Sequence, residues 1–260
     1  MFGKEEWISV DSIKIDISVQ RELQETHVSK IIKKFDPQAF GRLTVSKRED
    51  GFYYCSDGQH RLNVAKRLGL TEVPCIVVKS HSIVDEGENF IKVNEVSAKV
   101  SALDKYRIGV TVGNKEWLRV KECLDYAGVE AGTSVNKVNC LALLYKAVNS
   151  ATLLSSIEKN VFVVKKALYI LKHTVGTKGM SNQIVSGMII FVRHYILTDL
   201  TDTNTTIERL KRMDYKAITS KAQDMKYNSA RGKVDSYVAY LMLTEYNRNL
   251  KVKLPIKIEV

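Results

Sequence analysis

A strand, a tight turn and a helix in direct succession limit the folds open to this chain. The aromatic run Phe52–Cys55 predicts a strand, and Asp57-Gly58 ends it within a few residues. A helix is predicted from Gln59 to Leu68, because its apolar residues recur on one face and Gly69 follows as a stop signal. The segment therefore predicts a layer of helix packed against sheet.

The first 80 residues carry further short elements of both kinds. Extended runs are predicted at Trp7–Val10, Ile13–Ile17, Leu43–Ser46 and Val73–Val78, and a helix is predicted at Glu25–Phe35. The turn Asp50-Gly51 separates two of the extended runs, which predicts an antiparallel hairpin. This alternation is typical of a small mixed α/β domain.

The rest of the chain carries a helical pattern almost throughout. Helices are predicted over Ser82–Asn94, Ala102–Thr111, Glu116–Ala127, Val135–Val148, Asn160–His173, Asn182–Leu197, Asn204–Met213, Tyr215–Lys226 and Val234–Asn247. The tail from Lys251 alternates charged and apolar residues, which predicts an edge strand or an extended arm. The expected fold class is α+β, with a mixed α/β domain at residues 1–95 and a larger all-helical domain at residues 96–260.

The positive charge of the chain is concentrated in its second part. Of the net charge of +11, residues 1–95 contribute 14 Lys+Arg against 15 Asp+Glu, and residues 96–260 contribute 26 against 14. A basic segment joined to a neutral one predicts a polyanionic partner, most often nucleic acid. The alternative is a soluble basic surface without a specific partner.

The sequence predicts a cytoplasmic protein with no membrane partner. The first residues lack the basic start and apolar run of a signal peptide, and the most apolar stretch, Ile184–Leu197, is too short to span a bilayer. The four cysteines lie far apart without Cys-x-x-Cys spacing, so we expect buried thiols rather than disulfides or a metal site: Cys55, Cys75, Cys123 and Cys140.

The turn after the second strand of the hairpin carries the residues best suited to hold a phosphate. The amide groups and dipole of a helix N-terminus attract anions, and Gly58 lets a ligand approach the backbone closely. Arg61 can bind phosphate oxygens through two hydrogen bonds, and His60 can donate one or relay a proton. Asp57 can bind Mg²⁺ beside a phosphate or act as a base. The structural alternative is that Asp57 caps the helix while His60 and Arg61 are solvated.

The segment Asp57–Ala65 resembles the second signature box of the ParB/sulfiredoxin superfamily. Gly58, Arg61 and Ala65 stand at spacings close to the superfamily pattern, in which this turn binds nucleotide phosphates. Val19-Gln20-Arg21 is similar to the first box, although its proline is missing. The resemblance covers about residues 7–80. It implies a ParB/sulfiredoxin-like fold and these nucleotide-binding residues: Gln20, Arg21, Gly58, Gln59, His60 and Arg61.

Differences within the superfamily narrow the activity that the resemblance implies. Sulfiredoxin has a catalytic cysteine where this chain has Gln59, so sulfinic-acid reduction is excluded. Chromosomal ParB proteins carry Gly-Glu-Arg-Arg instead of Gly-Gln-His-Arg, so a CTP clamp does not follow from the resemblance. The free-serine kinases have an Asp-Gly-x-His-Arg turn and a glutamate in the first box, for which Glu22 is the nearest candidate. That resemblance makes Asp57, His60 and Glu22 the candidate catalytic residues and Asp57 the candidate metal ligand.

The string Asp-Gly-Gln-His-Arg also resembles phage and plasmid proteins of the ParB-like type and proteins of DNA-modification systems. Ser101–Tyr106 and Tyr246–Asn249 are similar to segments of the helical regions of those phage and plasmid proteins. The resemblance implies a mobile-element protein that works in the cytoplasm of a bacterial host.

The helical half offers two candidate DNA contacts. Helices Glu116–Ala127 and Val135–Val148 stand in the order of a helix-turn-helix whose second helix exposes Lys137; two ordinary core helices are the alternative. A second basic region can follow a phosphate backbone or form a solvated surface. The candidate DNA-binding residues are Lys137, Arg209, Lys211, Arg212, Lys216 and Lys221. A homodimer is a further expectation.

The leading hypothesis is a ParB-like, DNA-associated protein of a phage or plasmid. It binds an NTP with Mg²⁺, or a DNA phosphate, at Asp57–Arg61, and it binds DNA through the basic half. The alternatives are a small-molecule phosphotransferase resembling the free-serine kinases, a nuclease, and a phage protein that binds a host factor and has an inactive nucleotide site. The sequence contains no dense cluster of carboxylates or histidines for two-metal nuclease chemistry. Whether the chain is an enzyme, as an NTPase or phosphotransferase, stays open at this point.

Overall fold

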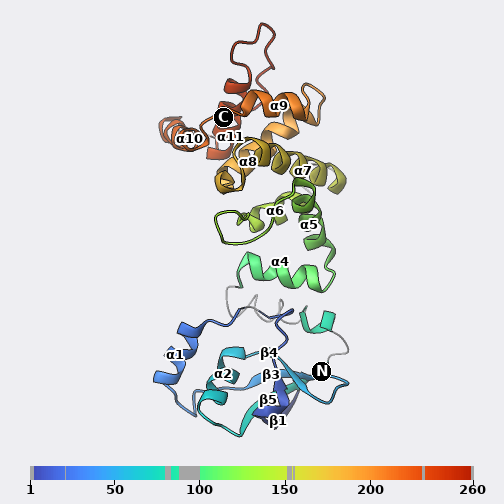
Figure 1. Cartoon of the computed structure of the whole chain (residues 1–260), viewed down its shortest axis with the longest axis vertical. Helices are drawn as coiled ribbons and strands as arrows, with labels where there is room; N and C mark the ends of the chain where they lie inside the picture. The colour runs from blue at the N-terminus through green and yellow to red at the C-terminus, as the bar shows by residue number, and fades with distance from the viewer. Residues whose placement is uncertain are drawn as a thin grey trace. The chain divides into compact units, whose positions relative to one another are not determined.

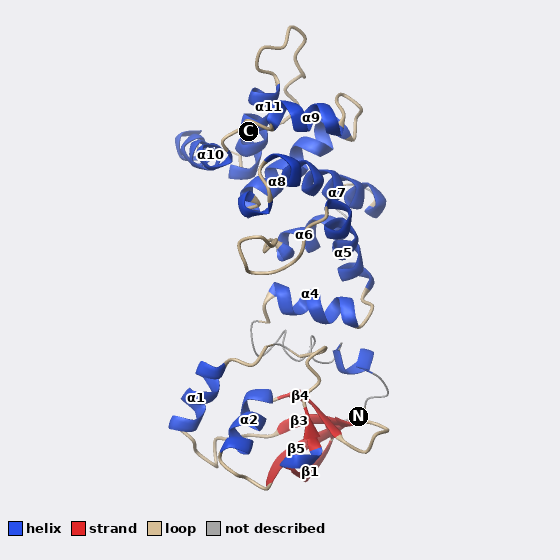
Figure 2. Cartoon of the chain, in the orientation of Figure 1, coloured by secondary structure: helices blue, strands red, loops and turns tan. Residues whose placement is uncertain are grey.

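The computed structural model describes residues 3–20, 22–79, 83–87, 100–150, 154, 156–229 and 232–258. The chain divides into two compact units, Met1–Asn114 and Lys115–Val260. The five-stranded sheet belongs to the first unit, and the second is built from helices (Figure 2). The fold class is therefore α+β, as the sequence predicted. Helix α4 (Ala102–Thr111), which follows the boundary inferred from charge, is grouped with the first unit.

A mixed sheet forms the centre of the first unit. Its strands are β1 (Lys4–Ser9), β2 (Ile13–Lys14), β3 (Leu43–Lys47), β4 (Tyr53–Asp57) and β5 (Glu72–Val78). The strand order is β1-β5-β3-β4-β2. Figure 1 labels β1, β5, β3 and β4 of this sheet. The pairs β1/β5 and β3/β4 are antiparallel, whereas β3/β5 and β2/β4 are parallel. The antiparallel hairpin predicted from the Asp-Gly turn is thus confirmed.

Helix α2 covers one face of this sheet. The helices of the first unit are η1 (Val10–Ser12), α1 (Glu25–Lys33), α2 (Gln59–Arg67), a helical turn at residues 83–87, and α4. Leu62 and Ala65 of α2 lie in one buried cluster with Leu43, Val45 and Cys55 of the strands. Because side chains alternate along a strand, Ser46 and Tyr54 point to the opposite face of the sheet.

The second unit is a stack of packed helices. They are α5 (Lys115–Ala127), α6 (Leu141–Asn149), α7 (Ile157–Thr174), η2 (Thr177–Gly179), α8 (Asn182–Phe191), η3 (Val192–Ile196), α9 (Thr203–Leu210), α10 (Tyr215–Ser229) and α11 (Val234–Tyr246). Helices α8 and α11 pack so closely that Gly187 has no room for a side chain. A Cβ atom added there would lie 2.4 Å from Cγ1 of Val238. Phe191 and Tyr195 are fully buried in this unit.

The connection between α5 and α6 differs from the helix-turn-helix prediction. Helix α6 begins at Leu141 rather than Val135, so 13 residues join the two helices. The amide of Val138 donates to the carbonyl oxygen of Glu130 at 2.7 Å, and that of Gly132 donates to the carbonyl oxygen of Val138 at 3.0 Å. These bonds fold the segment into a loop. A helix-turn-helix has a turn of about 3–4 residues, so this pair lacks its geometry.

Three other predicted elements also change. The run Ile13–Ile17 forms a strand only at Ile13–Lys14. The helix predicted over Asn182–Leu197 becomes π-helical at Val192–Ile196. The tail at residues 251–258 forms no strand, so its edge-strand alternative is wrong, whereas the extended-arm alternative stays a prediction. Of the helix predicted at Ser82–Asn94, residues 83–87 are helical, and the remainder lies outside the described residues. Among the described residues, no helix has the length and apolar character that a membrane span requires.

All four cysteines are free and buried, as the sequence predicted. Burial raises the pKa of the Cys75 thiol to about 11 and those of Cys123 and Cys140 to about 12, and it raises the pKa of Cys55 as well. Thiolate is the reactive form, so each thiol is shielded both by burial and by its protonation state.

We therefore expect the native chain to react slowly with thiol reagents at pH 8. The measurement is the number of thiols modified by a maleimide over time, counted by mass spectrometry, with the denatured chain as control. All four should be modified within minutes after denaturation, and fewer than one on average in the native state over the same time. Rapid labelling of a native thiol would contradict the burial of that cysteine.

Candidate functional site

The junction of β4 and α2 has a backbone conformation that requires glycine. Asp57 ends β4, and Gly58 adopts φ 102° and ψ 19° as the residue before the first turn of α2. A Cβ atom at Gly58 would lie 2.4 Å from Cδ2 of Leu43 and 3.1 Å from Nη2 of Arg61. Both the left-handed backbone and the close approach of neighbours therefore make a side chain at this position costly.

Buried polar side chains gather at this junction. Four of the eight buried polar or charged residues in the described part of the chain are Gln20, Ser56, Gln59 and His60. Ser56 lies at the end of β4, Gln59 and His60 lie at the start of α2, and Gln20 lies on the segment between β2 and α1. Polar side chains are rarely buried without hydrogen-bond partners. Their concentration at one helix N-terminus makes this junction the candidate site.

Arg61 holds the chain that leads into β3. Its Nη1 donates to the carbonyl oxygen of Arg42 at 2.6 Å and to that of Phe40 at 3.4 Å. Its Nη2 forms an ion pair with Oδ2 of Asp57 at 3.0 Å. The guanidinium is thus partly engaged by the protein itself. A phosphate that binds at the turn has to share Arg61 with Asp57.

Asp57 is an accessible carboxylate beside the helix start. Gly58, not Asp57, is the N-cap of α2, so the alternative in which Asp57 caps the helix is wrong. The Asp57 side chain is 38% exposed and bonds Arg61 through one oxygen. Carboxylates of this kind bind Mg²⁺ together with phosphate oxygens in many proteins. Asp57 is therefore placed where it can bind a cation.

His60 connects α2 to the start of α1. Its side chain is buried, so it is not the solvated residue of the structural alternative. Its Nε2 accepts a hydrogen bond from the amide of Gln24 at 3.2 Å, and its ring meets that of His27 edge-on at 4.9 Å between centroids. An accepting Nε2 requires a neutral imidazole with its proton on Nδ1. His60 thereby positions α1 against the junction.

The first signature box reaches the junction through one of its predicted residues. The side-chain amide of Gln20 donates to the carbonyl oxygens of Cys55 and Ser56, both at 3.0 Å. Arg21 lies outside the described residues. The carboxylate of Glu22 is 82% exposed and pairs with Arg107 of α4 at 2.7 Å. Within the described part of the chain, Glu22 forms no hydrogen bond or ion pair with Asp57 or His60.

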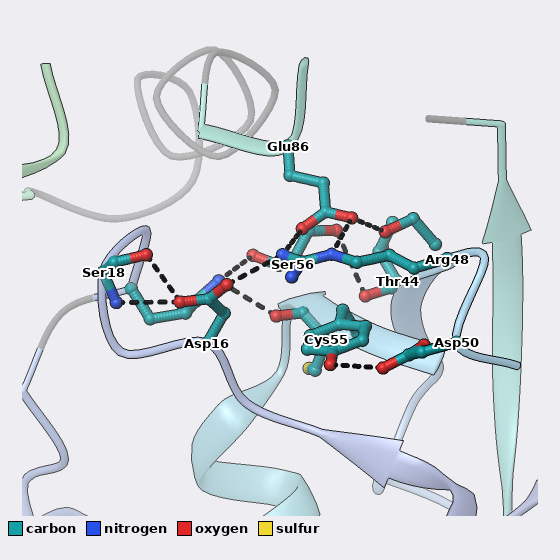
Figure 3. Close-up of polar contacts among 11 residues, drawn as sticks. Asp16, Ser18, Thr44, Arg48, Asp50, Cys55, Ser56 and Glu86 are labelled. Carbon is teal, nitrogen blue, oxygen red and sulfur yellow. Dashed lines mark hydrogen bonds and ion pairs between the residues drawn. The ribbon is translucent and has the colours of Figure 1, made fainter. Parts of the chain in front are cut away.

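The other face of the sheet holds a charged cluster that the sequence did not reveal (Figure 3). Glu86, which is 5% exposed, accepts hydrogen bonds from Oγ of Ser46 at 2.5 Å and from Nε of Arg48 at 3.0 Å. Arg48 also pairs with Asp16 at 2.9 Å and lies 3.6 Å from the centre of the Tyr54 ring. The cluster fastens the turn at residues 83–87 to the sheet.

Asp16 is held in its charged form within this cluster. Burial, the largest influence, opposes its ionisation, but hydrogen bonds from Ser18 and the charge of Arg48 together outweigh burial and lower the pKa of Asp16. Hydrogen bonds and charge from Glu86 and Asp16 raise the pKa of Arg48, against a smaller effect of burial. No local pattern could have revealed this cluster, because its residues come from three distant segments.

The predicted DNA-binding residues of the second unit fall into two groups. Lys137 pairs with Glu130 at 2.8 Å and Lys211 with Glu208 at 3.7 Å. Arg209 donates to the carbonyl oxygen of Tyr246 at 2.5 Å and to that of Arg248. The remaining three are exposed and have no ion pair within the described residues: Arg212, Lys216 and Lys221. The second group is therefore the better placed to bind phosphates.

No group of three or more His, Cys, Asp or Glu side chains that could bind a metal ion occurs among the described residues. Any cation at Asp57 would thus be held by a single protein carboxylate together with ligand oxygens.

Comparisons with known proteins place the chain in a family. Similar solved structures include the C-terminally truncated chromosome-partitioning protein ParB from Caulobacter crescentus, in one crystal complexed with CTP-gamma-S and in another with the centromeric parS site. The first is 14% identical, with 84% of this chain and 98% of that chain covered and a TM-score of 0.33; the second is 12% identical, with 91% and 98% covered and a TM-score of 0.34. The pNOB8-like ParB N-domain is 13% identical, with 92% and 94% covered and a TM-score of 0.42. No curated protein matches the sequence. A family model matches residues 17–258, and the chain therefore belongs to the family described as a family of unknown function, DUF6551.

Proposed function

We propose that this chain is a ParB-like, DNA-associated protein of a phage or plasmid, which binds a nucleotide at the turn Asp57–Arg61 and DNA through its basic helical unit. The observation that carries the proposal is the β4–α2 junction. There a glycine with a left-handed backbone opens the helix N-terminus, and buried polar side chains lie beside it. The resemblance of this turn to the superfamily's second box supports the same function.

In this proposal the nucleotide phosphates lie at the first turn of α2. The helix dipole and backbone amides favour an anion there. Arg61 lies at the same turn but already pairs with Asp57. A phosphate bound to Arg61 would therefore lie close to the Asp57 carboxylate, and the two negative charges would repel each other. A Mg²⁺ ion bound by Asp57 and the phosphate relieves the repulsion between these two anions. The proposal therefore includes Mg²⁺-dependent binding.

In this proposal His60 and Gln20 hold the protein segments around the site and do not contact the nucleotide. His60 orients α1 through the amide of Gln24, and Gln20 fixes the end of β4 through two carbonyl oxygens. We assign them positioning roles. Phosphotransfer, with Asp57 as the base, is the alternative activity at the same turn.

We expect CTP, ATP or GTP to bind the wild-type chain only with Mg²⁺, and Asp57→Asn to weaken that binding about tenfold, or 1.4 kcal/mol. Asp57→Asn removes the cation ligand while leaving Arg61 bonded to the carbonyls of Phe40 and Arg42. Asp50→Asn is the matched control, because Asp50 is a carboxylate of similar exposure, 43%, at the far end of β4. The measurement is calorimetric titration of each nucleotide with and without Mg²⁺.

Two outcomes would contradict this assignment. Equal affinities for wild type and Asp57→Asn would remove Asp57 from the site. Transfer of the γ-phosphate to a small-molecule acceptor in the absence of DNA would make the phosphotransferase the correct activity.

DNA binding is tested on the same protein. We expect duplex DNA to bind with an affinity that falls steeply with salt concentration. Replacing Arg212, Lys216 and Lys221 together with alanine should reduce the slope of log K against log[salt] by about 2–3, since each phosphate contact contributes about 0.9. An unchanged slope would show that DNA contacts other residues, and no binding at low salt would overturn the DNA part of the proposal.

A further inference from the structure

A basic cavity lies within the second unit. It has a volume of about 830 Å³, and its walls come from α6, the α8–η3 segment, the start of α11 and the C-terminal tail. Its cationic residues are Lys146, Arg193, Lys233 and Lys257, and Leu143, Ile189 and Ile190 form part of its apolar surface. This volume falls in the range of about 300–1,000 Å³ that is typical of small-molecule sites.

The charges around the cavity are unbalanced. Among the described residues that line it, the only carboxylate is that of Asp235, which accepts a hydrogen bond from Oγ of Ser186 at 2.7 Å. Within the described ranges none of the four cations has an ion-pair partner, whereas Lys137, Lys165 and Lys211 of the same unit each pair with a glutamate. A concave surface lined by unpaired charges of one sign concentrates ions of the other sign. The cavity therefore favours an anion.

Local structure fixes the positions of two of these cations, Arg193 and Lys257. Arg193 belongs to the π-helical segment Val192–Ile196, and π-helical turns inside helices occur frequently at functional sites. Lys257 is placed by the hydroxyl of Tyr195, which accepts from the Lys257 amide at 3.2 Å and donates to the carbonyl oxygen of Pro255 at 2.9 Å. The side chain of Asn247 further fixes the tail through Leu254, at 3.0 and 2.8 Å.

The start of α11 adds positive potential to the same cavity. This helix has 13 residues, and Lys233 is its N-cap. The Lys233 side chain forms no cap hydrogen bond in the described part of the chain. The carboxylate of Asp235 in the first turn of α11 offsets part of the potential of this helix start, so the cavity owes its positive charge mainly to its four cations.

We propose that this cavity binds a phosphorylated small molecule of nucleotide size, with its phosphates among the four cations and its apolar part against Leu143, Ile189 and Ile190. The combination of an apolar wall and a cationic rim matches a ligand that has both parts. A DNA duplex is too wide to enter a cavity of this volume. The site lies wholly in the second unit and does not depend on nucleotide binding at Asp57–Arg61.

Photolabelling of the full-length chain with 8-azido-ATP tests the proposal. The cavity variant replaces Lys146, Lys233 and Lys257 with alanine. The control variant replaces Lys115, Lys172 and Lys178, which are exposed residues of the same unit that do not line the cavity. All six lysines are exposed, so both variants should fold, which circular dichroism checks. Each variant loses three positive charges, so a difference between them reports the cavity.

We expect label on peptides from α6, η3 or the tail, and inorganic tripolyphosphate should compete for it. The apparent affinity at these peptides should fall at least about tenfold in the cavity variant and stay within about twofold in the control. No label in residues 115–260 up to about 1 mM nucleotide, or equal losses in the two variants, would overturn the proposal. Label in residues 1–114 is scored separately and reports the turn Asp57–Arg61, so either site can fail without the other.

Discussion

Replacement of Arg48 by leucine is expected to lower the free energy of unfolding of the first unit by about 3 kcal/mol. Arg48 is the counter-charge of Glu86, whose side chain is 5% exposed, and of Asp16. The substitution leaves two carboxylates close together without a cation, and one of them is buried. Leaving a buried charge without its partner lowers the free energy of unfolding by far more than the intact ion pair adds to it. The measurement is urea unfolding followed by circular dichroism.

The matched control is Arg67→Leu, which breaks an ion pair with the exposed Glu25 at 2.8 Å. Exposed pairs contribute about 0–1 kcal/mol, so this variant should lose little stability. Equal losses for Arg48→Leu and Arg67→Leu would show that the buried cluster has no special role in holding residues 83–87 on the sheet.

The stability of the wild-type chain should depend on the charge of Asp16. The pKa of Asp16 is lowered in the folded state, so the folded chain binds fewer protons there than the unfolded chain. Its contribution is present above the unfolded pKa, about 3.9, and is lost as the pH falls through the lower folded pKa. Between pH 7 and 5 this group therefore leaves the wild type unaffected.

The local parts of the first unit could be predicted because their signals lie within a few residues of one another. The hairpin follows from Asp50-Gly51 and its flanking extended runs, and the end of β4 follows from Asp57-Gly58. Helix α2 follows from its apolar face, so its predicted and observed starts agree at Gln59. Each signal, a turn residue or a periodic apolar face, can be read within a short segment of the sequence.

The side-chain partners at the site could not be predicted, because they come from distant segments. Arg61 was expected to bind phosphate or water, yet it bonds carbonyl oxygens of Phe40 and Arg42, about 20 residues earlier. His60 accepts from an amide 36 residues away. The charges of Arg48 and Glu86 meet across 38 residues. Such pairs leave no periodic trace in a single sequence.

In the second unit, the pairing of charged side chains could likewise not be predicted from the sequence. Composition correctly located the excess of cations after residue 95 but did not distinguish paired from unpaired ones. Lys137 lies in a loop rather than on a recognition helix, because backbone bonds between Glu130, Gly132 and Val138 override the helical pattern. The tail lysine Lys257 was a candidate phosphate contact in the sequence, but its placement beside Arg193 could not be predicted, since only the fold brings both to one cavity.

Replacement of Gly58 by alanine is expected to destabilise the first unit by about 3 kcal/mol, from backbone strain and overpacking together. The residue has φ 102°, and the new methyl group would meet Leu43 in the core and Arg61 at the site. Gly69→Ala separates the two causes, because Gly69 also has positive φ, 70°, but no atom lies within 4 Å of its added Cβ. That variant should lose only about 1–2 kcal/mol.

Gly58→Ala should also weaken nucleotide binding at the turn, whereas Gly69→Ala should not. The reason is that displacement of Arg61 would loosen both Asp57 and the chain before β3. Equal destabilisation of the two variants, measured by urea unfolding, would show that backbone strain alone explains the glycine and that the turn has room for a side chain.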